Sequence, residues 1–384
     1  MNCLEAHRDI GVHEVVDRRG NAFQLDERAF HANVEQVRRL LPPGTKIYQC
    51  AKGDGYGVGV ERIVCLGVRA GVDGFCLGTP EEALRAKCVA AGRPVLLFAG
   101  CDPAALGEMV EAGIIVSISS VEGCEALLRS GATGDVFFKL DCGFRRYGLN
   151  EPDLRTVLDR VRRQSSVRCI GAYSHFGSRA DEIVDGGLPL FDRLTRLIED
   201  AVQRPIETMV ASSTLILQRP GLGHSAVDPG RLLYGMMAAG PEMPPFQPIV
   251  PRISSRLLQV TPFDEARLLT VGYADKTAIP AGGATGVFPL GWIDGLSAHR
   301  GFGEVLIRGT RLSVVARTLQ HSIVNLSGLS DVRVGDEVVL VGAQGDEQIG
   351  LEAMASAQGM SVTEAHFRLL AAIAAGVPNG RQNG

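Results

Sequence analysis

Short apolar runs alternate with longer amphipathic stretches from about residue 22 to residue 250. Successive runs start roughly 20 to 35 residues apart, and Gly, Asp and Asn residues mark the turns between them. Strands that alternate with helices at such a spacing are typical of a parallel sheet. The pattern predicts strands over residues 22–25, 46–51, 74–77, 95–98, 114–118, 136–139, 169–173 and 208–211, and helices over residues 26–41, 79–91, 103–111, 120–129, 151–163 and 192–201.

About eight such units in about 230 residues predict a closed (β/α)8 barrel. An open, doubly wound sheet is the alternative, but the sequence has no G-x-G-x-x-G turn after the first predicted strand. We therefore expect residues 22–250 to form an N-terminal barrel domain.

The pattern changes after residue 250, where short strands are separated by turns rich in glycine and aspartate. This spacing predicts an all-β domain of barrel or sandwich type, formed by residues 251–384 together with residues 1–21. The glycine-rich residues 281–286 are expected to form a loop. Strands are predicted over residues 253–260, 267–271, 286–288, 304–307, 312–318, 323–326 and 337–341, and one last helix over residues 361–375.

Composition narrows the functional classes. The chain has 384 residues, a formal net charge of −4 and no cluster of basic residues interleaved with aromatics, so we expect no nucleic-acid partner. Its apolar runs fall far short of the roughly 20 residues that a membrane span needs. The first residues include acidic side chains and lack the apolar core of a secretory signal, so a cytoplasmic protein without a membrane partner is expected.

Cysteine and lysine usage point to different conclusions. The nine cysteines include no C-x-x-C pair, which predicts buried free thiols and no metal site. Only five of the 39 basic residues are lysines, so chemistry that needs a primary amine has few candidates.

One of these lysines, Lys52, stands at the end of a predicted strand in Ala51-Lys52-Gly53-Asp54-Gly55-Tyr56-Gly57. The carboxyl ends of barrel strands carry the chemistry of this fold. A lysine in a partly apolar pocket has a lowered pKa and is a nucleophile for aldehydes. The alternative is a surface lysine beside a flexible turn.

This segment resembles the pyridoxal-phosphate lysine motif of the alanine racemases, apart from Val58, where that family usually has histidine. The resemblance implies that Lys52 binds pyridoxal 5'-phosphate as a Schiff base and that the Tyr56 hydroxyl contacts its phosphate. Residues 75–84 look like the next strand–helix segment of the same enzymes.

Lys139-Leu140-Asp141-Cys142-Gly143-Phe144-Arg145-Arg146-Tyr147-Gly148 resembles the family signature K-x-D-T-G-x-x-R-x-G. It implies that Arg146 binds the substrate carboxylate or the phenolic oxygen of the cofactor. Lys139 would orient that arginine, in some members after carbamylation of its amine. Without the resemblance, the two arginines would be interpreted as a solvated pair in a loop.

Two further segments resemble cofactor-binding motifs. Ser174-His175-Phe176 is similar to the family's T-H-F motif, whose histidine lies near the cofactor ring. Ser213-Thr214 falls where the family has N-S, so the Thr214 hydroxyl is expected at the phosphate.

The segment Val227-Asp228-Pro229-Gly230-Arg231 aligns with the family's V-R-P-G-x but has Asp228 in place of the arginine that faces the pyridine nitrogen. A carboxylate there would hold the pyridinium proton and make the cofactor a stronger electron sink. The backbone at Gly230, with Arg231 beside it, is expected at the cofactor. The segment also resembles E-P-G-R of decarboxylases with the same fold; alternatively, Asp228 only caps the Pro-Gly turn.

The C-terminal part of the chain contains the remaining motifs that resemble the family. Val271-Gly272-Tyr273 resembles V-S-Y-G, which implies that Tyr273 is a second catalytic base delivered across a homodimer interface. The family's R-x-x-M-D reads Arg317-Thr318-Leu319-Gln320-His321, so Gln320 and His321 are expected at the substrate. Ala375 stands where the family often has tyrosine, which leaves room for a substrate side chain larger than a methyl group.

Together these motifs predict a homodimeric, pyridoxal-phosphate-dependent racemase with shared active sites, acting on a free amino acid larger than or different from alanine. A lyase of the same fold, a decarboxylase or aldolase on a hydroxy- or diamino acid, is the alternative that Asp228 favours. Decarboxylases of this fold use a cysteine in their C-terminal domain, and every cysteine here precedes residue 170. A non-catalytic carrier of the cofactor is a third possibility, but it would have no use for Arg146 and Tyr273.

Overall fold

The computed structural model describes residues 11–164, 166–176, 181–222, 224–237, 243–270, 276–298 and 303–377. They divide into two compact units. The first contains Ala29–Gly55 and Val60–Gln247, and the second contains residues 11–28, Tyr56–Gly59 and the described chain from Pro248 onward. The predicted domain boundary near residue 250 stays a prediction.

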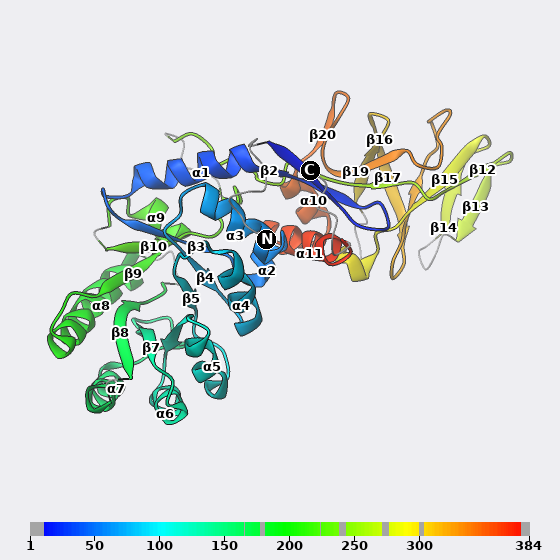
Figure 1. The fold of residues 1–384 in the computed structure, drawn as a ribbon. Coiled ribbons are helices and arrows are strands. Elements are labelled where there is room, and N and C mark those ends of the chain that lie inside the picture. Colours follow the sequence, from blue (N-terminus) through cyan, green and yellow to red (C-terminus); the bar gives the residue numbers. More distant parts are fainter. Residues whose placement is uncertain are drawn as a thin grey trace. The chain divides into compact units, whose positions relative to one another are not determined.

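Eight parallel strands close into a barrel in the first unit, which confirms the predicted barrel fold (Figure 1). Strands β4 and β6 are buried at every position, as expected where helices cover a parallel sheet. In order around the barrel the strands are β10 (Ala226–Asp228), β3 (Lys46–Cys50), β4 (Gly74–Leu77), β5 (Val95–Leu97), β6 (Ile115–Ile118), β7 (Gly134–Lys139), β8 (Val167–Tyr173) and β9 (Glu207–Ser212).

Each barrel strand contributes one buried side chain to a common interior cluster, so the barrel has a packed core rather than a pore. These side chains are Tyr48, Cys76, Leu96, Ile115, Phe137, Tyr173, Met209 and Ala226.

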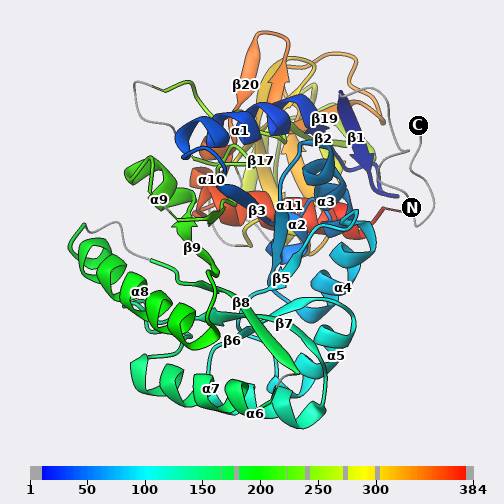
Figure 2. The ribbon, with the colours of Figure 1, turned by 60° about the vertical axis from the view of Figure 1, so that its left-hand side comes forward.

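Helices surround the barrel strands (Figure 2). Several begin at side chains that cap free backbone N–H groups: Thr79 accepts from Glu82 N, Ser120 from Gly123 N and Asn150 from Asp153 N. The helices of this unit are α1 (Glu27–Leu40), α2 (Lys52–Tyr56), α3 (Val60–Arg69), α4 (Pro80–Val89), η1 (Pro103–Ala105), α5 (Leu106–Glu111), α6 (Val121–Ser130), α7 (Glu151–Arg163), α8 (Asp181–Val202) and α9 (Ser213–Gln218).

The predicted first barrel strand was wrong. Residues 22–25 belong to β2 (Ala22–Asp26), which pairs with β1 (Val12–Val16) and with a strand of the second unit. A tight turn fixes this hairpin, because Asp17 accepts hydrogen bonds from the backbone and side-chain amides of Asn21 at 2.9 and 2.8 Å. The barrel is closed instead by β10, whose three residues are too few to give a strand signal in the sequence.

The second unit contains a ten-stranded antiparallel sheet, which confirms the predicted all-β domain. A separate two-stranded hairpin, formed by β13 (Arg267–Thr270) and β14 (Lys276–Ile279), follows β12 in the sequence and is not part of this sheet. The strand order in the sheet is β1, β2, β11 (Arg252–Arg256), β19 (Glu337–Gln344), β16 (Glu304–Ile307), β17 (Thr310–Arg317), β18 (Ser322–Asn325), β15 (Gly283–Phe288) and β12 (Gln259–Phe263). The short strand β20 (Glu347–Ile349) pairs with β19. The helices of this unit are η2 (Trp292–Asp294), α10 (Leu351–Ala357) and α11 (Val362–Ala375).

The glycine-rich loop predicted at residues 281–286 is largely a strand, β15. Its glycines allow neighbouring side chains to approach closely. A Cβ atom on Gly286 would lie 2.8 Å from Leu257 Cδ2, and one on Gly283 would lie 2.6 Å from Ser327 Oγ. Close packing, rather than turn formation, therefore explains these residues.

Seven described cysteines carry free thiols, and five of these are buried. The prediction of free thiols fails at Cys65, which is disulfide-bonded. Cys88 is exposed and Cys101 is half-buried, so burial is not general either. Within the described ranges, no helix combines the length and the apolar character that a membrane crossing requires.

Candidate functional site

The predicted site residues of the first unit stand where barrel strands end. Lys52 follows β3, Lys139 is the last residue of β7, His175 follows β8 and Asp228 ends β10. Because all eight strands are parallel, these carboxyl ends share one face of the barrel. The charges of Lys52, Lys139 and Arg146 all act on His175, so the structure brings these predicted residues together.

The Lys52 side chain is exposed, and the backbone after it turns in the left-handed direction. The φ angles of Gly53, Asp54, Gly55 and Tyr56 are 66°, 47°, 65° and 56°. For a residue with a side chain this conformation costs roughly 1–2 kcal/mol, so Asp54 must be held in place. Its Oδ1 accepts hydrogen bonds from Val60 N and Arg85 Nη1, both at 3.0 Å.

Lys139 is buried, with 4% of its surface exposed. Its Nζ donates to the Leu140 carbonyl at 3.1 Å and lies 5.0 Å from the centroid of the Tyr173 ring. Burial lowers the pKa of Lys139 to about 8, against the opposing effect of neighbouring acidic groups that include Asp228. A sizeable fraction of its amine is therefore neutral just above neutral pH.

Tyr173 is a site residue that the sequence interpretation missed. Its hydroxyl donates to Ser117 Oγ at 2.9 Å and accepts from Ala99 N at 2.9 Å, and burial raises its pKa. The hydroxyl thus joins β8 to β6 and to the segment after β5, beneath Lys139. The available signal was its place as the last strand residue before Ser174-His175.

We expect Tyr173→Phe to lower the free energy of unfolding by about 1–2 kcal/mol, because it leaves the buried Ala99 amide and Ser117 hydroxyl without this partner. Urea denaturation of the cofactor-free protein measures the change. Tyr147→Phe is the matched control, since the Tyr147 ring is 45% exposed and should change stability by less than about 0.5 kcal/mol. Equal stability of wild type and Tyr173→Phe would contradict a structural role for the bridge.

Aromatic rings connect His175 to Arg146. The Phe144 ring meets His175 edge-on at 5.2 Å, and the Arg146 guanidinium carbon lies 4.5 Å from the Phe144 centroid. Burial, with the charges of Lys139, Lys52 and Arg146, lowers the pKa of His175 to about 4. The imidazole is therefore neutral at pH 7 and cannot add a further positive charge.

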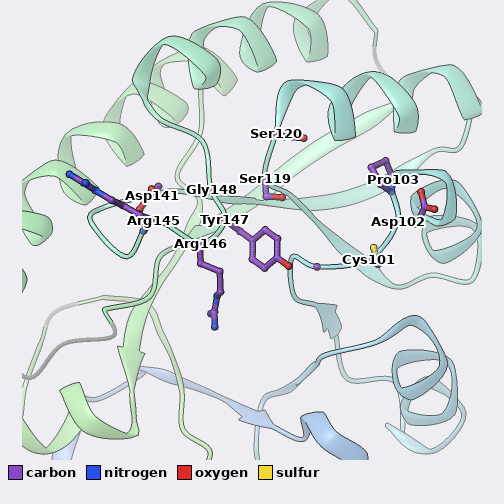
Figure 3. Close-up of a pocket in the computed structure, with 11 residues that line it drawn as sticks. Cys101, Asp102, Pro103, Ser119, Ser120, Asp141, Arg145, Arg146, Tyr147 and Gly148 are labelled. Carbon is purple, nitrogen blue, oxygen red and sulfur yellow. Dashed lines mark hydrogen bonds between the residues drawn. The ribbon is translucent and has the colours of Figure 1, made fainter.

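Arg146 and Tyr147 line a cavity of about 680 Å³ formed by the segments that follow β5, β6 and β7 (Figure 3). Figure 3 shows that the Arg145 and Arg146 guanidinium groups point in different directions. The Arg145 backbone has a φ of 56° and donates to Asp141 Oδ1 at 3.0 Å. This fixed turn separates the two arginines, so Arg146 alone stacks on Phe144.

Asp228 is half-buried at the end of β10. Burial raises the pKa of its carboxyl group to about 7, although Lys52 and Lys139 lower it. The carboxyl group thus lies close enough to both lysines for their charges to lower its pKa, and it is partly ionised near neutral pH.

Ser213 and Thr214 have different environments. Ser213 is buried, and its Oγ accepts hydrogen bonds from Gly230 N at 3.0 Å and Leu232 N at 3.2 Å. Thr214 Oγ1 accepts from Arg231 Nη2 at 3.1 Å. The Gly230 amide is therefore already engaged by Ser213, whereas Thr214 and Arg231 present a hydroxyl and a guanidinium side by side.

The remaining predicted residues belong to the second unit or are outside the described residues. Tyr56 belongs to the second unit, as do Gln320 and His321, which form a turn between β17 and β18 closed by a 2.8 Å bond from Thr318 N to the His321 carbonyl. Buried Arg317 precedes this turn and donates to Ser322 Oγ at 3.0 Å. Tyr273 lies outside the described residues.

Pyridoxal phosphate fits the chemistry of the barrel residues. Its aldehyde requires a primary amine, its phosphate requires hydroxyl and cationic donors, and its ring nitrogen can pair with a carboxyl group. Lys52, the Thr214–Arg231 pair and Asp228 supply these groups at one face of the barrel.

Comparison with known proteins gives the same family for both parts of the chain. The family "Alanine racemase, N-terminal domain" matches residues 25–238, and "Alanine racemase, C-terminal domain" matches residues 250–375. The alanine racemase of Syntrophobacter fumaroxidans is 28% identical over 353 residues, which cover 88% of this chain and 92% of that protein.

Solved structures share the fold. The alanine racemase from Streptomyces coelicolor A3(2) has a TM-score of 0.76 and 27% identity, covering 94% of this chain and 97% of its own. The histidine racemase from Leuconostoc mesenteroides subsp. sake has a TM-score of 0.79 and 21% identity, with the same coverage. With both domains matched, the chain belongs to the alanine racemase family of pyridoxal-phosphate-dependent isomerases.

Proposed function

We propose that this protein racemises a free amino acid with a side chain larger than a methyl group, by proton transfer between two bases at Cα. The observation that carries the proposal is the grouping of Lys52, Arg146 and Asp228 at one face of a barrel that belongs to the racemase family. An amine, an anion-binding group and a carboxyl group for the cofactor are the parts that this reaction needs.

Three groups of residues would hold the cofactor. Lys52 would hold the aldehyde through its amine, Thr214, Arg231 and Tyr56 would hold the phosphate, and Asp228 would pair with the ring nitrogen. Ser213 and Gly230 act indirectly, since their mutual hydrogen bond fixes the segment that carries Arg231. When bound, pyridoxal phosphate withdraws electrons and so stabilises negative charge at the substrate Cα.

The chain's own groups orient the substrate and move its proton. Arg146, stacked on Phe144, binds the substrate carboxylate, and Lys139 would orient it once carbamylation makes its amine an anion. Neutral His175 packs near the ring without adding charge beside that arginine. Lys52 Nζ takes or returns the Cα proton on one face of the substrate, and Tyr273 from a second copy of the chain serves the other face.

Two further proposals accompany this mechanism, one about the assembly of the protein and one about its cellular location. A base from a second copy requires a homodimer in which active sites are shared, with Gln320 and His321 also directed to the substrate. A cytoplasmic location is supported by the described cysteines, of which seven are free thiols and one, Cys65, is disulfide-bonded, because mostly free thiols suit a reducing compartment.

Room beside Arg146 supports a substrate larger than alanine. The cavity of about 680 Å³ far exceeds the volume of a methyl group, and its lining includes Ser119, Asp102 and the Tyr147 hydroxyl. A polar side chain would find hydrogen-bonding partners there. The structural neighbour from Leuconostoc, named a histidine racemase, is consistent with a larger substrate on this fold.

Incubation of the cofactor-loaded enzyme with L- and D-amino acids in deuterated water tests the proposal. We expect deuterium at Cα with inverted configuration for at least one amino acid that carries a polar side chain, and faster turnover of it than of alanine. Chiral chromatography with mass spectrometry measures both. Faster turnover of alanine than of every larger amino acid would contradict the substrate assignment.

A lyase is the second candidate, and Asp228 is the observation that favours it. A carboxyl group at the ring nitrogen increases electron withdrawal, which also assists bond cleavage other than loss of the α-proton. The same experiment separates the two reactions, because racemisation conserves product mass apart from deuterium and a lyase releases a fragment.

A further inference from the structure

The carboxylate of Glu82 connects the segments that follow two neighbouring barrel strands. Oε1 accepts a hydrogen bond from Asp54 N at 2.6 Å, in the turn after β3, and Oε2 accepts one from Gly78 N at 3.1 Å, just after β4. The Glu82 residue is 9% exposed. A buried carboxylate with two backbone donors is a strong, fixed connection, because each bond to a charged acceptor is stronger than a neutral one.

Both of these contacts flank Lys52. Asp54 is two residues after Lys52 and lies in the left-handed turn, whose φ angle of 47° at Asp54 needs support from its surroundings. Gly78 packs against the Lys52 side chain, since a Cβ atom at Gly78 would stand 3.1 Å from Lys52 Cβ. Movement of either Asp54 or Gly78 would therefore displace the lysine.

Glu82 is itself held in a defined place. It lies in the first turn of α4, where its backbone N donates to the capping Thr79 Oγ1 at 3.2 Å. One turn later, Arg85 Nη1 donates to Asp54 Oδ1 at 3.0 Å, and Arg85 Nε donates to Glu61 Oε1 at 2.6 Å. Helix α4 thus holds Asp54 from two positions, of which Glu82 is the buried one.

We propose that Glu82 is a positioning residue for Lys52: it fixes the left-handed turn and the β4 end between which the lysine stands. The proposal rests on the proposed function, in which Lys52 binds the cofactor and moves the Cα proton. Because Arg146 lies on the segment after β7, loss of Glu82 acts on the lysine and leaves substrate affinity nearly unchanged.

Glu82→Gln is the direct test, with Glu81→Gln as its matched control. The glutamine keeps the size of the side chain but places an NH2 group against a backbone N–H, so one of the two hydrogen bonds is lost. Glu81 is exposed on the same helix, which makes its substitution equal in charge and length. Glu82→Asp retains the charge, but its side chain is too short to reach both amides. Circular dichroism of each variant tests that it is folded.

The first readout uses the cofactor-free protein. Amide hydrogen exchange, followed by mass spectrometry of peptides that cover residues 52–56 and 76–79, reports how firmly these segments are held. In Glu82→Gln we expect exchange at least about tenfold faster than in wild type in at least one of these two segments, and in Glu81→Gln no change in either. Peptides from α7 serve as an internal reference and should exchange at the wild-type rate.

The second readout uses the cofactor-loaded enzyme. We expect a kcat about tenfold lower in Glu82→Gln with KM changed by less than about twofold, and partial recovery in Glu82→Asp. The pH at which the visible absorbance of the lysine-bound cofactor titrates should also shift in Glu82→Gln but not in Glu81→Gln.

The proposal is overturned if a folded Glu82→Gln protein exchanges the amides of both 52–56 and 76–79 at the wild-type rate, or if its loss of activity is entirely in KM. These results are distinct from a failure of the proposed function. If the proposed function fails, the wild-type enzyme itself would show no lysine-bound cofactor and no exchange at Cα. The amide hydrogen-exchange result in the cofactor-free protein would still decide the role of Glu82.

Discussion

Lys52→Ala protein is expected to lose the visible absorbance of bound cofactor and to catalyse α-proton exchange at least about 10³-fold more slowly than wild type. In the proposed function the Lys52 amine would hold the cofactor aldehyde and would also move the proton, so one substitution would remove both roles. Its exposed side chain at the end of β3 contributes little to the core, so the variant should fold. Absorbance spectroscopy and deuterium incorporation at Cα measure the two losses.

Lys46→Arg is the control, because Lys46 stands at the opposite end of the same strand and forms an ion pair with Glu207. Arginine keeps that charge, and both cofactor absorbance and exchange should be unchanged. Persistent visible absorbance in Lys52→Ala would show that another amine binds the cofactor. Lys139 would then be the next candidate, since its pKa of about 8 leaves a neutral amine available.

The barrel was predictable because its strands are buried on both faces and separated by regular helices. Seven of the strands gave apolar runs, but the three-residue β10 did not, and β2 was assigned to the barrel because a single strand carries no information about its partner. Its hairpin with β1 depends on the Asp17–Asn21 contacts, which only the folded chain shows. Local pattern thus predicts elements better than it predicts their pairing.

The candidate site was predictable to the extent that motifs name residues. The sequence placed Lys52 and His175 at strand ends, and the structure places them there too. It named Asp228 from its motif, but not the strand β10 that carries it. It could not reveal the Tyr173 bridge or the Glu82 contacts, because these join segments far apart in the chain, such as Tyr173 and Ala99. Nor could it show that Ser213 is buried beneath Gly230 while Thr214 meets Arg231.

Asp228→Asn is expected to lower kcat by about 100-fold, the size of effect seen when one electrostatic stabiliser of a developing charge is removed. An uncharged amide cannot hold a proton on the ring nitrogen as a carboxylate does, so electron withdrawal at Cα weakens. The cost should fall on kcat, since Asp228 does not contact the substrate carboxylate in the proposed arrangement. Steady-state racemisation rates of both enantiomers measure it, and an undiminished kcat would support the alternative in which Asp228 only caps the Pro-Gly turn.

The same substitution should stabilise the cofactor-free protein at high pH. Burial raises the pKa of Asp228 from 3.8 to about 7, so between these values the folded protein holds a proton that the unfolded chain releases. Stability is therefore lost as pH rises from about 4 to about 7, and above that the buried negative charge costs its full amount. After allowance for the partial exposure of the carboxylate, Asp228→Asn should gain about 1–2 kcal/mol in the free energy of unfolding at pH 8 and nothing at pH 4.

Urea denaturation at both pH values tests this expectation. Asp346→Asn is the control, because Asp346 is an exposed carboxylate in the turn between β19 and β20, and its substitution should change the free energy of unfolding at neither pH. A gain of equal size at pH 4 and pH 8 would mean that the carboxylate charge is not its source. The expected pattern, higher stability with lower activity, would identify Asp228 as a group whose half-buried charge destabilises the folded chain and serves the proposed reaction.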